Sequence, residues 1–106
     1  MFYPATKLVI TTEQFLAERV CKIIDESKAK GYTLVPAGGK GLHHSKQPTL
    51  KQASVVEGFD NVKIDVITLD RAIAEKIADR ILEECFNDYP GVMYLEQVEV
   101  CRPERF

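Results

Sequence analysis

A run of alternating apolar and charged residues constrains the fold more than any other part of the sequence. Val62, Ile64 and Val66 alternate with Lys63 and Asp65. Successive side chains of a strand point to opposite faces, so this alternation predicts a strand with one buried face and one face towards water. A sheet that contains such a strand needs helices on one face only.

Three further segments have the composition of strands. Lys7–Thr11 is short, apolar and β-branched, Tyr32–Val35 is similar, and Val92–Val100 follows a break rich in turn-forming residues. Pro36, directly after the second of these runs, has no backbone N–H and therefore indicates an edge strand or a strand end. We expect four strands in total.

Two segments between the strands have the apolar spacing of helices. These apolar residues are Leu16, Val20, Ile23 and Ile24 in the first segment and Ile73, Ala74, Ile77, Ala78 and Ile81 in the second. Thr11 and Gln14 fit a capping box at the start of the first helix, and Gly31 is expected to end it. Asp70 is expected to cap the second helix.

The order strand–helix–strand–strand–helix–strand is the ferredoxin-like arrangement of the α+β class. We expect a single domain over residues 1–106, with a four-stranded antiparallel sheet, two helices on one face and a long loop after the second strand. The other face carries Val9 and Ile67, which are apolar although no helix remains to cover them. Apolar residues at such a surface favour contacts between subunits, so the sequence predicts an oligomer.

Charge and composition argue against several classes of function. The 106 residues carry a net charge of -2, so a whole-domain basic surface for nucleic acid is absent. No apolar run approaches the roughly 20 residues of a membrane span, and the N-terminus lacks the pattern of a secretion signal, so we expect a cytoplasmic protein. The three cysteines form no CxxC motif, which argues against a disulfide framework.

The longest stretch without a regular pattern runs from Gly38 to about Asp60. Loops longer than roughly 12–15 residues in compact domains are usually functional or disordered. The backbone amides of Gly39 and Gly41 can approach an anion closely, and Lys40 adds a charge suited to phosphate. The spacing fits neither a Walker loop nor a dinucleotide fingerprint, so phosphate binding and a plain flexible hinge both stay open.

Further charged groups have two interpretations each. His43 and Lys46 lie in the same loop, either as solvated surface or as added charge around a phosphate. Arg102 and Arg105 lie in the C-terminal tail, either solvated or as bidentate donors to an anion on a neighbouring subunit. No nucleophile, acid and base stand in a recognisable arrangement, so we do not expect an enzyme.

Four motifs, KLVIT, IIDESKAKGYT, AGGKG and FNDYPG, resemble the PII-like signalling proteins. The nearest group is that of SbtB, the partner of a cyanobacterial bicarbonate transporter, together with the carboxysome-associated PII proteins. The resemblance implies a homotrimer, without a covalent cofactor, that binds AMP, ADP, ATP or cyclic AMP in clefts between subunits. It implies a T-loop at about residues 38–60 that docks on a partner, such as a bicarbonate transporter at the membrane. Bicarbonate is a further candidate ligand.

The same resemblance implies the residues of the nucleotide site, which come from five parts of the chain. They are Gly31, Tyr32 and Thr33 near the adenine, with Asp65 on the adjacent strand; Gly39, Lys40 and Gly41 at the phosphates; Tyr89 and Gly91 in the turn that closes the cleft; and Arg102 and Arg105 from the C-terminal segment.

The chain departs from SbtB-type proteins at three points. His43 and Lys46 stand where those loops often carry arginine, so bidentate recognition of phosphate is lost there. The charge of His43 changes near neutral pH, which would make binding pH-dependent. Cys101 is the single cysteine of the tail, so it cannot form the intrachain disulfide of some SbtB proteins. The ending CRPERF looks more like the carboxysome-associated branch.

Two alternatives belong to other functional classes. A trimeric metal-binding protein of the CutA type would use His43 and His44, which are common metal ligands. An RNA-binding module of the same strand order is disfavoured, because the strand at residues 61–68 lacks the aromatic residues that stack on bases.

Overall fold

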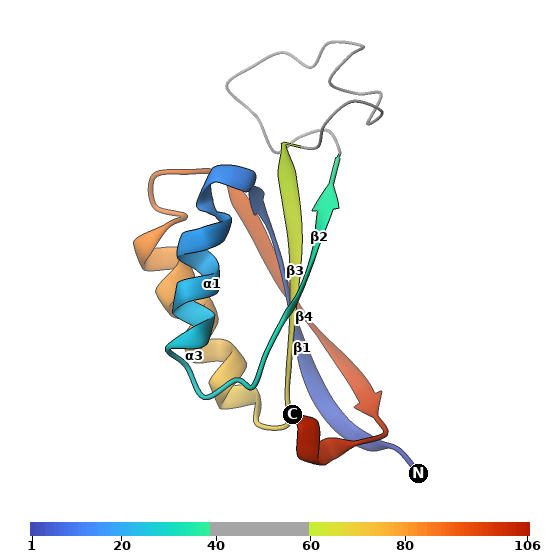
Figure 1. Cartoon of the computed structure of the whole chain (residues 1–106). Coiled ribbons are helices and arrows are strands. Elements are labelled where there is room, and N and C mark those ends of the chain that lie inside the picture. The colour runs from blue at the N-terminus through green and yellow to red at the C-terminus, as the bar shows by residue number, and fades with distance from the viewer. Residues whose placement is uncertain (39–59) are drawn as a thin grey trace.

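The computed structural model describes residues 1–38 and 60–106, which form a sheet covered by helices on one face (Figure 1). The elements are β1 (Tyr3–Glu13), η1 (Gln14–Leu16), α1 (Ala17–Asp25), β2 (Thr33–Ala37), β3 (Asn61–Thr68), α3 (Arg71–Glu84), β4 (Gly91–Val100) and η2 (Pro103–Arg105). This order confirms the predicted ferredoxin-like α+β fold.

Strand β1 lies at the centre of the sheet, whose order is β2-β3-β1-β4 with every pair antiparallel. The strands β2 and β4 are therefore the two edges. Pro36 lies within β2, which agrees with the prediction of an edge strand, since an edge tolerates a residue without a backbone N–H.

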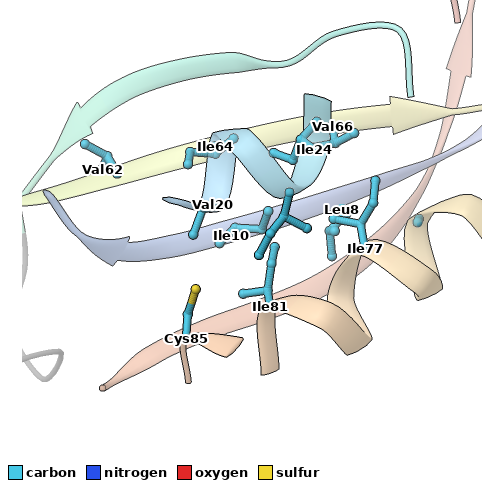
Figure 2. Close-up of a cluster of buried hydrophobic side chains, with 12 residues drawn as sticks. Leu8, Ile10, Val20, Ile24, Val62, Ile64, Val66, Ile77, Ile81 and Cys85 are labelled. Atoms are coloured by element: carbon cyan, nitrogen blue, oxygen red, sulfur yellow. The ribbon is translucent and has the colours of Figure 1, made fainter. Parts of the chain in front are cut away.

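The hydrophobic core fills the layer between the sheet and the helices (Figure 2). Residues opposite each other in the register share a face, and Ile10 is paired with Ile64 and Met93 on the face under the helices. The buried cluster consists of Leu8, Ile10, Val20, Ile23, Ile24, Val62, Ile64, Val66, Ala74, Ile77, Ile81 and Cys85. Full burial of one aliphatic side chain contributes roughly 1.5–3 kcal/mol, so this layer is the main source of stability.

The second helix begins as predicted. Asp70 precedes α3, and its carboxylate accepts a hydrogen bond from the backbone N–H of Ala72 at 2.9 Å. This bond satisfies one of the amides that a helix start leaves without a partner.

The predicted ends of the first helix are wrong. Thr11 belongs to β1, where it is paired with Lys63 and Val92, so it cannot cap a helix. The first turn is the 3-10 turn η1, and α1 ends at Asp25, six residues before Gly31. Ser27 ends the helix instead, because its hydroxyl donates to the carbonyl oxygen of Ile24 and accepts from the N–H of Ala29.

The face of the sheet away from the helices, the open face, combines apolar and charged residues. The Nζ atom of Lys7 forms ion pairs with Asp65 Oδ2 at 3.6 Å and with Glu96 Oε1 at 3.7 Å. The Nζ atom of Lys63 lies 3.9 Å from the same Oδ2 atom of Asp65. Val9 is only 1% exposed although it is on this face. The exposed apolar residues of this face instead include Tyr3, Val35, Val92 and Tyr94. The prediction of an oligomer stays a prediction.

The start of β4 depends on the absence of a side chain at Gly91. A Cβ atom there would lie closer than 3.0 Å to three ring atoms of Phe86, which packs against the core. Gly31, by contrast, has no atom within 4 Å of the corresponding position.

We therefore expect Gly91→Ala to lower the free energy of unfolding by about 1–3 kcal/mol, since the Phe86 ring must move out of a packed position. Gly31→Ala is the matched control and should change stability by no more than about 1 kcal/mol. Urea denaturation at equal protein concentration measures both. Combining Gly91→Ala with Phe86→Leu should recover part of the loss, and equal stabilities of the two glycine variants would contradict the packing role.

Candidate functional site

The first group of candidate residues surrounds the start of β2. Gly31 and Tyr32 precede this strand, and Thr33 begins it, directly opposite Asp65 of β3 on the open face. The Asp65 side chain is 25% exposed, and its Oδ1 atom is buried without a hydrogen-bond partner among the described residues. A buried carboxylate oxygen without a partner is unfavourable, so a donor from a ligand or a second chain would be stabilising here.

Tyr32 lies on the helix side of the sheet edge rather than with Asp65. It lines a shallow groove together with Phe15, Cys21 and Leu34. A hydrogen bond with the Cys21 thiol raises the pKa of the Tyr32 hydroxyl above its ordinary value. Of the predicted adenine-contacting residues, only Thr33 and Asp65 therefore share a face.

The C-terminal segment returns to the same end of the molecule. The Nζ atom of Lys30 donates to the carbonyl oxygen of Glu104 at 2.9 Å, which ties η2 to the chain just before Gly31. Arg102 precedes η2 and Arg105 lies within it, both exposed. Neither guanidinium forms an ion pair within the part of the chain that the structure describes. Both are therefore available to an anion.

The second group lies in the turn from α3 into β4, at the end of the molecule opposite to the C-terminal arginines. Tyr89 packs edge-to-face on Phe15, with ring centroids 5.0 Å apart and an interplanar angle of 81°. Gly91 begins β4 opposite Thr12. In Figure 1 this turn is at the same end as the last residue of β2 and the first residue of β3, between which residues 39–59 lie.

Within one chain, the C-terminal arginines and the turn at Gly91 lie far apart. Gly91 starts β4, and Arg102 follows its last residue, Val100. A strand rises about 3.3 Å per residue, so Gly91 and Arg102 are roughly 30 Å apart. A single site that uses both these arginines and this turn needs them from different chains.

Five candidate residues, Gly39, Lys40, Gly41, His43 and Lys46, lie outside the described residues, as does His44. Among the described residues, no group of three or more His, Cys, Asp or Glu side chains is placed to hold a metal ion. In the same part of the chain, no helix is long and apolar enough to cross a membrane.

Several contacts at the site have no signal in the sequence. The Phe15–Tyr89 pair, the groove that Tyr32 and Cys21 share, and the link from Lys30 to the tail all join separate segments. Only the fold brings these partners together, so spacing along the chain does not indicate them.

Comparison with known proteins gives a consistent result. The family model described as nitrogen regulatory protein P-II matches residues 5–105. A PII-like signaling protein from Thermus thermophilus is 30% identical, with a TM-score of 0.77 over 99% of this chain and 97% of that one.

Two more distant structures share the fold. CPII from Thiomonas intermedia K12, a nitrogen regulatory PII-like protein solved with ADP, AMP and bicarbonate, is 23% identical, with a TM-score of 0.76 over 100% of both chains. GlnK from B. subtilis, solved with ATP, is 15% identical, with a TM-score of 0.59 over 90% of this chain and 82% of that one. The predicted resemblance to PII-like proteins is confirmed, and the chain belongs to the nitrogen regulatory protein P-II family.

Proposed function

We propose that this protein is a trimeric PII-like regulator that binds an adenine nucleotide in clefts between subunits and passes the signal to a partner protein. The family match over residues 5–105 carries this proposal. Its relative CPII was solved with ADP and AMP, which supports an adenine nucleotide as the effector. The role is regulatory rather than enzymatic.

The positions of the candidate residues support a site between chains. One chain supplies Thr33, Asp65 and the C-terminal arginines, and its neighbour supplies the turn at Tyr89 together with the T-loop base at residues 39–41. Head-to-tail contacts of this kind close into a ring when the rotation between copies allows it, and a ring of three has three equivalent clefts. The exposed apolar residues of the open face and of the edge strands supply a surface for such contacts.

Each half of the proposed cleft has its own chemistry. The unpartnered Oδ1 atom of Asp65 accepts a hydrogen bond from a ribose hydroxyl or an adenine amine. Arg102 and Arg105 hold the phosphates, because planar guanidinium groups bind phosphate through paired hydrogen bonds. Lys40, His43 and Lys46 add charge from the T-loop of the neighbouring chain.

The signal is a shift in the population of T-loop states at residues 38–60. A nucleotide can shift this equilibrium only by its differential affinity for the states. The proposed partner is a membrane transporter for bicarbonate or another part of inorganic-carbon uptake, as in the SbtB group, so the cytoplasmic protein would bind at the membrane surface. The bicarbonate in one CPII structure supports bicarbonate as a second ligand.

The proposed assembly makes a direct prediction about mass. In solution at micromolar concentration, light scattering should give about 36 kDa, three times the 12.0 kDa of one chain. A mass of 12.0 kDa at that concentration would contradict the trimer, and with it the cleft between chains.

The second prediction concerns the C-terminal arginines. Replacing Arg102 and Arg105 together by alanine should weaken ADP binding roughly 10- to 100-fold, because hydrogen bonds to a charged group contribute about 1.5–3 kcal/mol. Calorimetry with ADP and with adenosine measures this, and adenosine affinity should change less than about twofold, because adenosine lacks phosphates.

Arg71→Ala is the control for this pair of substitutions. Arg71 is also exposed, but it lies on α3 and pairs with Glu75 at 2.6 Å. This variant should bind ADP like the unmodified protein. An unchanged ADP affinity in the double variant would remove the arginines from the site.

The third prediction concerns the T-loop. Saturating ADP or AMP should slow amide hydrogen exchange in residues 38–60, because the bound nucleotide selects one loop state. Residues 71–77, the half of α3 far from the turn at Tyr89, serve as the internal reference. Exchange in residues 38–60 that does not change at saturation would refute the switch.

A further inference from the structure

The outer surface of the helices contains a crevice that the nucleotide site does not use. Helix α1 has 9 residues and α3 has 14, so at about 1.5 Å per residue α3 is longer by roughly 7 Å. The two helices run antiparallel, and the first half of α3 extends past the point where α1 ends (Figure 1). The short first helix therefore leaves part of α3 without a helical neighbour.

The resulting α1–α3 crevice has a volume of about 340 Å³. Its lining comes from the end of α1 with the following turn, and from Asp70 and the first ten residues of α3. The residues are Ile23, Glu26, Ser27, Lys28, Asp70, Ala72, Ile73, Lys76, Ile77 and Arg80. Ligand sites are typically concave, mostly apolar and about 300–1,000 Å³, so this crevice is at the small end of that range.

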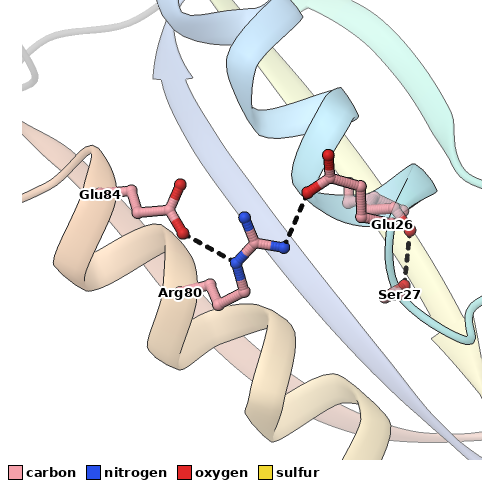
Figure 3. A network of polar contacts seen from close by, with 5 residues as sticks. Glu26, Ser27, Arg80 and Glu84 are labelled. Atoms are coloured by element: carbon pink, nitrogen blue, oxygen red, sulfur yellow. Dashed lines mark hydrogen bonds and ion pairs between the residues drawn. The ribbon is translucent and has the colours of Figure 1, made fainter.

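The floor of the crevice is apolar and its position is fixed. Ile23 and Ile77 belong to the buried core, and Ile73 packs against it. Arg80 joins the two walls, since its guanidinium reaches Glu26 of the α1 end at 3.1 Å and Glu84 at 2.8 Å (Figure 3). The crevice is thus a preformed feature rather than a gap between loosely attached helices.

The charges at the rim favour an anion. Three basic and two acidic side chains line the crevice, which leaves a net charge of +1 on a protein with a net charge of -2. Glu26 is paired with Arg80, and the Asp70 carboxylate accepts from Ala72. The ammonium groups of Lys28 and Lys76, in contrast, have no ion pair or hydrogen bond among the described residues.

We propose that the α1–α3 crevice binds a small monocarboxylate with an apolar body, whose carboxylate lies between Lys28 and Lys76 and whose apolar part covers Ile73 and Ile77. A nucleotide fits this site poorly, because no aromatic residue lines the crevice to stack on a base. The crevice is on the outer helix face, so its ligand binds whether or not the proposed nucleotide function holds.

The test uses the full-length protein without nucleotide and three probes with the same apolar body. These are 4-phenylbutyrate, 4-phenylbutanol and 4-phenylbutylamine. Binding of each is measured from the chemical-shift changes of the backbone amides in NMR titrations. The acid should give saturable shifts at residues 26–28 and 72–77, with an affinity at least about threefold above that of the alcohol, while the amine should give none. No saturable shift with the acid at 10 mM, about the weakest affinity of interest, would overturn the proposal.

Variants at exposed positions separate recognition from loss of folding. Lys28→Glu and Lys76→Glu should each lower the affinity for 4-phenylbutyrate at least about threefold, because the reversed charge repels the carboxylate. Lys22→Glu is the matched control, since Lys22 is an exposed lysine of α1 that does not line the crevice. Ala72→Trp should block the crevice sterically and abolish the shifts while ADP binding stays unchanged.

Two other outcomes would also overturn the proposal. Equal affinity for acid, alcohol and amine would mean that the crevice has no preference for charge. Shifts at residues 72–77 that appear on raising the protein concentration alone would mean that a second copy of the chain covers the crevice.

Discussion

The hydrogen-bonded pairing of β1 with β3 on one side and β4 on the other is the interaction on which the rest of the structure depends. This strand is bonded to β3 and β4 along most of its length, and its alternate side chains divide the molecule into two sides. Leu8 and Ile10 face the helices, while Lys7 and Val9 face the open side. A shift of one residue would exchange the two sides, so the core and the open face are fixed by the same register.

The long central strand also explains why one chain holds two separated halves of a site. β4 runs antiparallel to β1 for ten residues and carries the chain from the turn at Tyr89 to the tail at Arg102. The tail is tied back to the start of β2 by Lys30. The C-terminal arginines and the turn at Tyr89 are thereby kept apart, and contact between chains is the way to combine them in the proposed site. Oligomerisation is then a requirement for the proposed function rather than an addition to it.

The sequence predicts the architecture well and the boundaries less well. The alternation around Ile64 and the spacing of Ile73, Ile77 and Ile81 were sufficient because burial acts on each strand and helix separately. The capping box at Thr11 failed because pairing of β1 with two strands outweighs a local capping preference. Gly31 resembled a helix terminator, but the Ser27 side chain ends the helix earlier. For the site, the facing of Thr33 and Asp65 depends on sheet register, and the packing of Gly91 against Phe86 depends on the tertiary fold, so neither has a local signal.

The central claim is that the two ends of one chain serve different clefts, and mixing of subunits tests it directly. One variant would carry Arg102→Ala with Arg105→Ala, and the other Lys40→Ala with Tyr89→Ala, and ADP would be used at a concentration too low for either variant alone to bind it measurably. After unfolding and refolding together in equal amounts, random assembly should restore ADP binding in about one cleft in four, because a cleft then takes its intact halves from two different chains. If the mixed protein assembles but binds no ADP, the site is not shared between chains in this way.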